Sequence, residues 1–124
     1  MQNSAALAYQ QVGKQTVSPR VLEANLLSRS AAQLQRVRDD WENSRRDLFE
    51  ALRFNRKLWN TFMTSVTGEE SKLPRDLREN IANLGIFVMK QTLSTQSSPE
   101  PRKLDSLINI NRELAAGLRA TSPE

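Results

Sequence analysis

Residues 47–66 carry an uninterrupted apolar stripe with aromatic side chains, and this stripe constrains the fold more than any other feature of the chain. Its members recur at alternating steps of four and three residues, which is the spacing of one face of an α-helix. They are Leu48, Leu52, Asn55, Trp59, Phe62 and Val66. Because an apolar face of this width is unfavourable in water, other helices must cover it. The stripe therefore predicts the central helix of a helical bundle.

The remainder of the chain also has helical spacing, and no segment shows the strict alternation of a β-strand. With four glycines and five prolines in 124 residues, helix breakers are few. We therefore predict an all-α fold, a single domain over residues 1–124 built as a bundle of four longer helices plus a short N-terminal helix. The expected helices cover residues 4–13, 19–40, 45–67, 74–95 and 101–118, and residues 119–124 are expected to fray.

Several helix boundaries have recognisable signals. Ser18 followed by Pro19 is a capping hydroxyl next to a proline at the first helical position. Ser44 and Asp47 resemble a weak capping box, which predicts a new helix from residue 45; a continuous helix through this region is the alternative. Gly68 lies where a left-handed residue commonly ends a helix.

The helix expected at 74–95 has two unusual features. Gly85 in its interior costs about 1 kcal/mol relative to alanine, and the usual reason for such a glycine is the close approach of another backbone; a glycine present by sequence drift, with no packing role, is the alternative. Ile86 and Phe87 cannot both face inward with the buried stripe, so at least one packs on a neighbouring helix or is exposed for a partner. Residues 94–101, rich in serine and proline, read as a linker.

The composition excludes most catalytic chemistry. The chain has no cysteine and no histidine, so it lacks disulfides, thiolate ligands, and the commonest general base and zinc ligand. We expect no enzyme activity, no cofactor and no metal site. No run of 18 apolar residues is present and the N-terminus does not resemble a secretory signal, so we expect a cytoplasmic protein without a membrane segment.

Asn55 and Asn111 each occupy the middle of an apolar helical stripe. A buried amide without a partner costs about 1–3 kcal/mol, so each is expected to have one. Two interpretations stay open: the amides hydrogen-bond across the core and fix the register of the helices, or they line a groove and bind the backbone of a docked segment. Asn80 and Asn83 lie nearer the edge of their stripe and fit either arrangement.

A basic face runs beside the stripe of residues 47–66 and permits an acidic partner. An RNA-binding role is one interpretation of this face, and a solvated helix surface is the other. Asp47 and Glu50 neutralise part of it through one-turn pairs, and Trp59 is expected in the core rather than stacked on a base. The basic residues are Arg45, Arg46, Arg53, Arg56 and Lys57.

Three segments, at residues 51–59, 73–88 and 107–118, together resemble the FlaF family of flagellar biosynthesis regulators. They occur in the family's order and, with the opening stretch, the resemblance covers nearly the whole chain. Phe54 stands where many members have tyrosine, and Leu114 where isoleucine is common; the first change removes a hydroxyl donor. The resemblance carries the expectations that follow.

The resemblance implies a small α-helical cytoplasmic protein needed for flagellin production and export, which acts opposite the translational regulator FlbT. Flagellin is the implied partner, bound in a chaperone-like manner by a helix laid in a groove. FlbT or another flagellar regulator is a further implied partner, and an RNA-binding regulator of flagellin mRNA is the alternative. The residues predicted to form the core or rim of the partner site are Arg53, Asn55, Arg56, Trp59, Asn80, Asn83, Phe87, Asn111 and Arg112.

Overall fold

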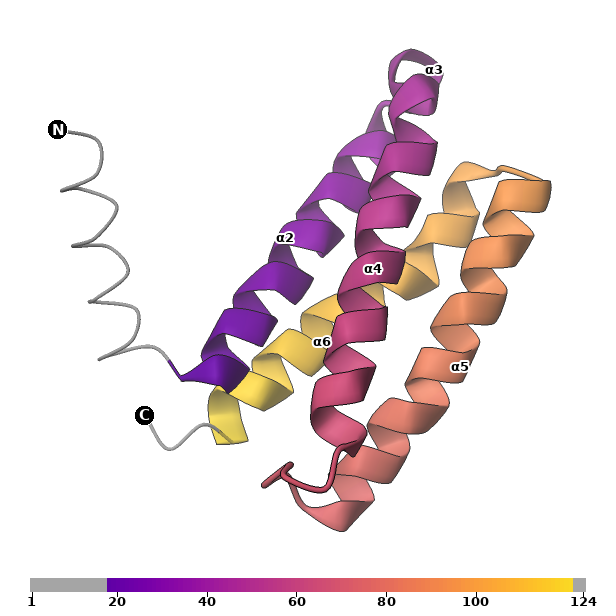
Figure 1. Cartoon of the computed structure of the whole chain (residues 1–124). Helices are drawn as coiled ribbons and strands as arrows, with labels where there is room; N and C mark the ends of the chain where they lie inside the picture. The colour runs from indigo at the N-terminus through magenta and orange to yellow at the C-terminus, as the bar shows by residue number, and fades with distance from the viewer. Residues whose placement is uncertain (1–17, 122–124) are drawn as a thin grey trace, which may run out of the picture.

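The computed structural model describes residues 18–121, and this part of the chain contains helices and no strand (Figure 1). The all-α prediction is therefore confirmed, as are its four longer helices. The short helix expected at residues 4–13 lies outside the described residues. The elements are α2 (Pro19–Asp39), α3 (Trp41–Ser44), the 3-10 helix η1 (Arg45–Asp47), α4 (Leu48–Thr67), α5 (Arg75–Ser97), the 3-10 helix η2 (Pro101–Leu104) and α6 (Asp105–Thr121).

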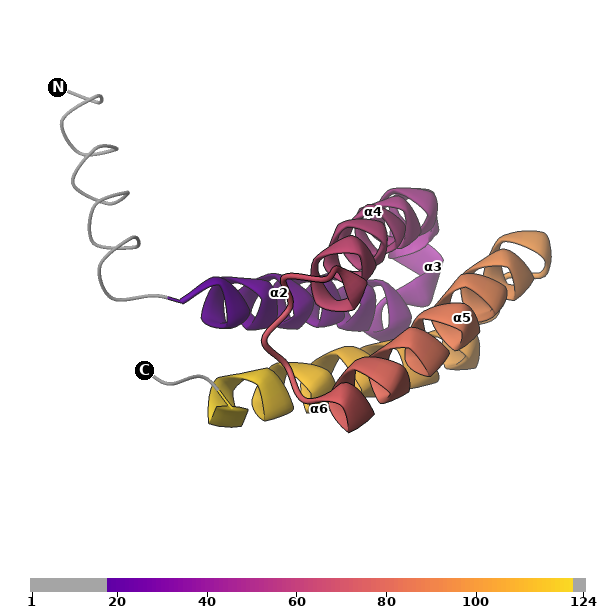
Figure 2. The same cartoon turned by 60° about the horizontal axis from the view of Figure 1, so that its bottom comes forward.

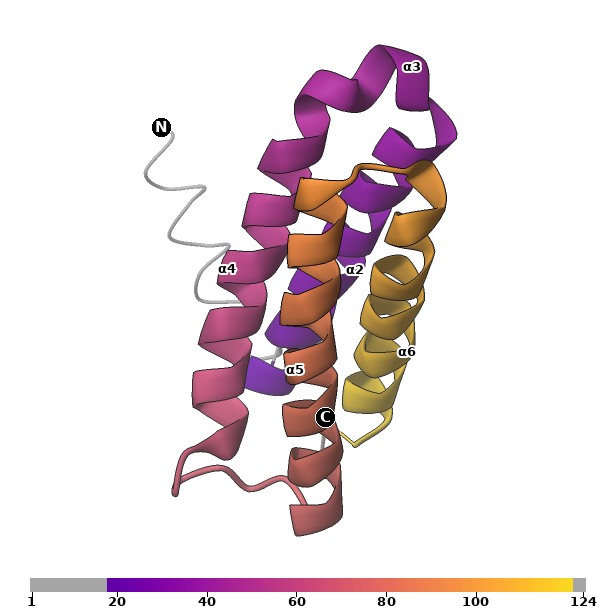
Figure 3. The ribbon, with the colours of Figure 1, turned by 90° about the vertical axis from the view of Figure 1, so that its right-hand side faces the viewer.

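The long helices run alternately up and down, so that each is antiparallel to the next along the chain (Figures 1 and 3). Helix α2 packs against both α4 and α6, while α5 packs mainly against α4 and touches α6 and η2 more briefly. Figure 2 places α5 at one margin of the bundle, and Figure 3 shows it on the side opposite α2. Helix α5 is therefore the least enclosed of the four long helices.

The predicted stripe of α4 is the centre of the core. All of its members are buried, and Trp59 meets Phe62 edge-to-face with the ring centroids 5.6 Å apart. The prediction that Trp59 is a core residue is confirmed, since its side chain is fully buried. The largest buried side chains from the other helices are Leu27, Leu34, Ile81, Leu104, Leu107, Ile108 and Leu118.

The start of α2 follows its sequence signal, whereas the start of α4 does not. The Ser18 hydroxyl oxygen accepts a hydrogen bond from the Val21 amide at 3.2 Å, with Pro19 at the first helical position. Ser44 makes no capping bond, so the predicted capping box is wrong. The chain instead turns through α3 and η1, and a regular helix resumes only where Leu48 can be buried.

The turn between α4 and α5 also differs from the prediction. Gly68 has φ −70° and ψ 161°, which is extended rather than left-handed. The chain leaves α4 by straightening, and the Gly68 carbonyl then accepts a hydrogen bond from the Ser71 amide at 3.1 Å. A single extended residue thus replaces the left-handed stop.

Helix α5 continues into the segment that was expected to be a linker. Thr92 and Thr95 are buried on its inner face, and their hydroxyls donate to the carbonyls of Val88 and Gln91, each at 2.7 Å. These bonds satisfy the buried hydroxyls inside the helix, so the helix persists to Ser97.

At the C-terminal end, α6 reaches Thr121, which includes the first residues expected to fray. The Arg119 guanidinium donates to the Asn25 side chain at 2.9 Å and to the Ser28 hydroxyl at 3.1 Å, which joins α6 to α2. Within residues 18–121, no helix combines the length and the apolar character needed to cross a membrane.

Candidate partner-binding surface

Asn55 and Asn111 meet inside the bundle, in a fully buried polar cluster with Ser30 and Trp59. The Asn111 amide nitrogen donates to Asn55 Oδ1 at 2.8 Å, and the Ser30 hydroxyl donates to the same oxygen at 2.8 Å. The Trp59 Nε1–H donates to Asn111 Oδ1 at 2.9 Å. Of the two interpretations left open by the sequence, pairing across the core is the one that the structure shows.

The cluster joins three helices and satisfies almost all of its own polar atoms. Ser30 comes from α2, Asn55 and Trp59 from α4, and Asn111 from α6. Asn55 Nδ2 is the one buried polar atom of the cluster that has no hydrogen-bond partner among the described residues. Because any sliding of α4 along α6 would separate these pairs, the cluster fixes the register of the helices.

The nine residues predicted for the partner site do not lie together. Asn55, Trp59 and Asn111 belong to the buried cluster, so a partner reaches none of them in the folded bundle. The other six are exposed and lie on three helices. Arg53 and Arg56 are on α4, Asn80, Asn83 and Phe87 are on α5, and Arg112 is on α6.

Arg112 lies on an edge of α6 that faces α2. It stands seven residues from both Asp105 and Arg119, so the three share one edge of the helix. Asp105 binds the Arg38 guanidinium of α2, and Arg119 binds Asn25 of the same helix. Arg112 is thus separated from the exposed surface of α5. Binding of a partner by the predicted residues remains a prediction.

The exposed side of α5 is unusually apolar. Residues 80–99 contain one charged side chain, Lys90, although α5 is the least enclosed long helix. Ile86 and Phe87 are both exposed, to 57% and 41%, and Leu93 is exposed to 60%. Half of the exposed large apolar residues in the described chain therefore come from α5, and the others are Leu22, Leu26 and Phe49.

Two of these exposed residues, Ile86 and Leu93, belong to a regular pattern on α5. Ala82, Ile86, Met89 and Leu93 recur at steps of four, three and four residues, so they form a second apolar stripe beside the buried one. Ala82 and Met89 are half-buried, and Met89 packs against the core, while Ile86 and Leu93 are exposed. This spacing was present in the sequence, but periodicity alone does not distinguish an exposed stripe from a buried one.

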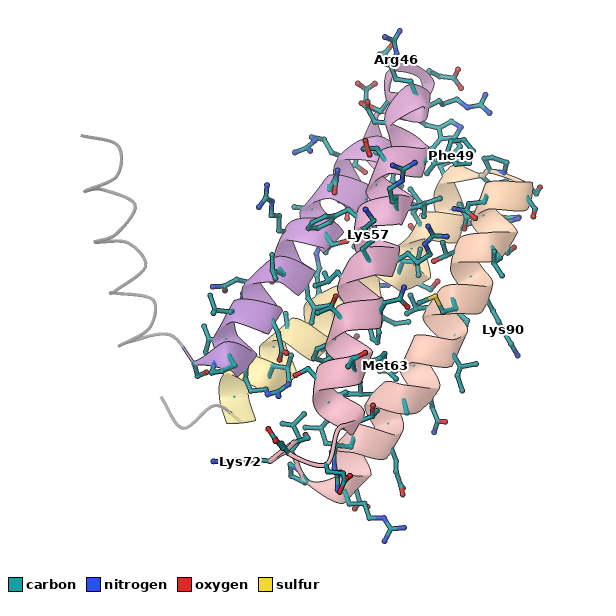
Figure 4. The ribbon with its side chains drawn as sticks, in the orientation of Figure 1. Arg46, Phe49, Lys57, Met63, Lys72 and Lys90 are labelled. Atoms are coloured by element: carbon teal, nitrogen blue, oxygen red, sulfur yellow. The ribbon has the colours of Figure 1, made fainter. Side chains whose placement is uncertain are left out.

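The row of α4 beside this stripe carries two arginines and no acidic residue. Phe49, Arg53, Arg56, Asn60 and Met63 recur at the same alternating steps along α4. Figure 4 shows Phe49 and Met63 on the side of α4 toward α5 and Lys90 pointing away from the bundle. We call the surface formed by this row and the second stripe of α5 the α4–α5 seam.

Contact between Met63 and Gly85 sets the alignment of the seam. A Cβ built on Gly85 would lie 2.8 Å from the Met63 sulfur, so the glycine accommodates a side chain rather than the backbone expected from the sequence. Because the helices are antiparallel, seven residues back along α4 corresponds to seven residues forward along α5. Arg56 therefore lies level with Thr92, next to the exposed Leu93.

The charges of the seam are predominantly positive and lack partners within the described chain. Arg53, Arg56 and Lys90 form no ion pair with any residue of 18–121. The acidic residue at the lower end, Glu79, is paired with Arg75 at 3.1 Å. A hollow of about 230 Å³ continues the seam at this end, lined by Thr67, Arg75, Arg78, Glu79 and Ala82.

A second basic surface lies between α2 and α4. A hollow of about 340 Å³ there is lined by Arg29, Ala32, Gln33, Arg36 and Phe54. The Arg29 guanidinium is 5.9 Å from the centre of the Phe54 ring, within cation–π range. Asp47 and Glu50 line the adjoining hollow together with Arg36, so acidic groups lie beside this surface. The one-turn pairs predicted between these carboxylates and the basic residues of α4 are not formed, since neither Asp47 nor Glu50 has an ion pair among residues 18–121.

Arg20, near the start of α2, links a carboxylate of its own helix to a hydroxyl of α4. The Glu23 carboxylate pairs with Arg20 at 2.6 Å, and Arg20 also donates to the Ser65 hydroxyl at 3.2 Å. Burial raises the pKa of Glu23, and the neighbouring Arg20 charge opposes that rise. No group of three acidic residues within 18–121 is arranged to hold a metal ion.

The chain matches a known protein family over most of its length. The family model described as flagellar protein FlaF matches residues 5–118, which is nearly the whole chain. No curated protein and no solved structure matches the chain. The match agrees with the resemblance recognised in residues 51–59, 73–88 and 107–118.

Proposed function

The chain belongs to the FlaF family of flagellar proteins, and we propose that it binds flagellin in the cytoplasm and supports its production and secretion. In this role the protein is a chaperone-like partner and not an enzyme. The family is a flagellar one, and the molecule offers a surface suited to binding another helix. The observation that carries the proposal is the exposed apolar side of α5.

The exposed residues of α5 are energetically unfavourable in the isolated protein. Burying apolar surface stabilises a complex by about 25 cal/mol per Å² before the costs of association are deducted. Ile86, Phe87 and Leu93 leave much of their surface in water, and nothing in residues 18–121 covers it. A flagellin segment that is amphipathic and disordered before assembly would gain from covering this surface by forming a helix on it.

Calorimetric titration of the full chain with monomeric flagellin tests the proposal. We expect a saturable 1:1 heat signal at micromolar concentration and a rise in the unfolding temperature of the protein, because a ligand that binds only the folded state stabilises it. Absence of both heat and stabilisation at these concentrations would contradict flagellin binding. Titration with FlbT under the same conditions tests the adaptor role.

RNA binding to flagellin mRNA is a second candidate function. Arg29 and Arg36 of α2, with Arg53 and Lys57 of α4, form no ion pairs within the described chain, which favours an anionic ligand. Affinity for the mRNA leader would fall steeply with salt because counterions are released from the phosphates. It would also be lost on the double change Arg53→Glu and Arg56→Glu. A gel shift that is absent, or that is unchanged by salt, would exclude this function.

A further inference from the structure

We infer that the α4–α5 seam is the docking site for an amphipathic helix whose apolar face is bordered by carboxylates. This inference deepens the proposed function, because it names the surface used and the chemistry of the segment bound. It depends on the apolar row of α5 and on the charges around that row.

The apolar row has the length and spacing of a helix-binding surface. From Ala82 to Leu93 it spans about 16 Å, or roughly three helical turns, at 1.5 Å per residue. Its alternating steps of four and three residues are those by which two packed helices interlock their side chains. The buried stripe of α5 already serves the core through Ile81, Val88 and Thr92. In the second stripe Met89 also packs against the core, while Ile86 and Leu93 are exposed and available to another helix.

The charges specify the sign of the partner. Arg53 and Arg56 lie along the α4 side of the seam, and Lys90 lies on the outer side of the α5 row. None of these cations is paired with a described carboxylate, and the nearby Glu79 is held by Arg75. A bound helix with carboxylates along its margins would supply ion-pair partners for these three cations, whereas a basic helix would be repelled by them.

The same charges disfavour a second copy of this chain as the occupant. If two copies paired through α5 about a two-fold axis near the middle of the row, Lys90 of each would approach Lys90 of the other. The arginines of the two α4 helices would also lie around one interface without acidic partners. The acidic helix is therefore the occupant that the observations favour over self-association.

The experiment uses the full chain and three probes. The probes are monomeric flagellin and two synthetic amphipathic peptides of equal length that share one leucine-rich face. One peptide has glutamate along its margins, and the other has lysine at the same positions. Calorimetry should show that the glutamate peptide binds and that the lysine peptide binds with an affinity lower by about tenfold or more, since charge reversal removes attraction and adds repulsion. Equal affinities would overturn the inference about charge.

Paired variants locate the surface. The double change Ile86→Ser with Leu93→Ser should lower the affinity for flagellin and for the glutamate peptide by about tenfold or more, because each ligand loses its apolar contacts with these two side chains. The matched control is Leu22→Ser with Leu26→Ser, two exposed leucines one turn apart on α2. The control should bind as the unchanged chain does. If the control loses binding and the α5 variant keeps it, the seam is not the site.

Charge variants separate the inference from the proposed function. The double change Arg56→Glu with Lys90→Glu should lower the affinity for the glutamate peptide and raise the affinity for the lysine peptide. Arg112→Glu should change neither affinity. Flagellin binding that is insensitive to every seam variant would support the proposed function and overturn the seam. Seam-dependent binding of the glutamate peptide without flagellin binding would support the seam and overturn the flagellin proposal. Self-association in sedimentation that is lost in the α5 variant would identify a second copy as the occupant and overturn the inference.

Discussion

The buried cluster and the α4–α5 seam are opposite departures from the usual distribution of side chains. In the cluster, the amides of Asn55 and Asn111 are fully buried, and in the seam Ile86 and Leu93 are more than half exposed. Every buried polar side-chain atom of the cluster except Asn55 Nδ2 is hydrogen-bonded within the chain, and these bonds join α2, α4 and α6. No described residue covers the exposed apolar side chains of the seam or pairs with its cations. The difference separates a feature that stabilises the fold from one that is available to a partner.

The comparison predicts that changes in the cluster reduce stability and that changes in the seam reduce binding. Burial is what separates the two sets, since both consist of residues at regular helical positions. Three experiments test this division through the free energy of unfolding, and a fourth measures the pH dependence of stability at Glu23, which lies outside both regions.

The largest loss is expected for Asn55→Ala. This change removes the oxygen that accepts from Ser30 and Asn111 and leaves two buried donors and a small cavity, so the free energy of unfolding should fall by about 2–4 kcal/mol. Urea denaturation followed by circular dichroism measures the loss. Asn60→Ala, an exposed position on the same helix, is the control and should change stability by less than about 0.5 kcal/mol. A loss no larger than that of the control would show that the cluster contributes nothing to folding.

A smaller effect is expected where the seam meets the core, at Gly85. Alanine favours a helix by about 1 kcal/mol over glycine, but its methyl group would collide with the Met63 side chain. Gly85→Ala should therefore gain about 1 kcal/mol in a Met63→Ala background and clearly less in the unchanged chain. Thermal or urea denaturation of the four proteins of this cycle gives both values. Equal gains in the two backgrounds would mean that Met63 does not determine the need for glycine.

The exposed seam residues should matter little for folding. Ile86→Ser and Leu93→Ser should each change the free energy of unfolding by at most about 0.5 kcal/mol, because neither side chain is in the core. The same denaturation series measures this. A loss comparable to that of Asn55→Ala would place these residues in the core and remove the distinction between the two regions.

The smallest expected effect is a pH dependence from Glu23. Its pKa is raised above the ordinary value of 4.5 by burial, so the folded protein holds this proton more tightly than the unfolded chain. Stability should therefore fall as the pH rises from about 4.5 through the raised pKa and then level off. Comparing Glu23→Gln with the exposed Glu113→Gln isolates the contribution in unfolding curves recorded across this range. An identical pH profile for both variants would contradict it.

The sequence was sufficient to predict the four long helices and the need of Asn55 and Asn111 for hydrogen-bond partners. Regular apolar spacing identified four long helices, and the position of Asn55 and Asn111 within their stripes predicted that each amide would have a partner. These predictions succeed because side-chain periodicity and the cost of an unpaired buried amide are local rules. The turn at Gly68 and the path through α3 depend on how neighbouring helices meet, which no local signal describes.

The candidate site was harder to predict for a related reason. Periodicity shows which residues share a helix face but does not show which face is covered. From spacing alone, Trp59 and Asn111 fit both the core and a partner site, and the regular spacing of Leu93 with Ile86 does not reveal that both are exposed. Arg112 was grouped with residues of α5, although its neighbours on α6 bind α2. The arrangement of the helices supplies the missing information.

Hydrogen exchange of the full chain, with and without monomeric flagellin, tests the central claim most directly. If a partner helix covers the seam, backbone amides of α5 and of residues 53–66 of α4 should exchange more slowly in the complex. Those of α2 and α6 should change little, because almost all polar atoms of the buried cluster are already hydrogen-bonded within the chain. Slower exchange confined to α2 and α6, or no change at saturating flagellin, would contradict the account.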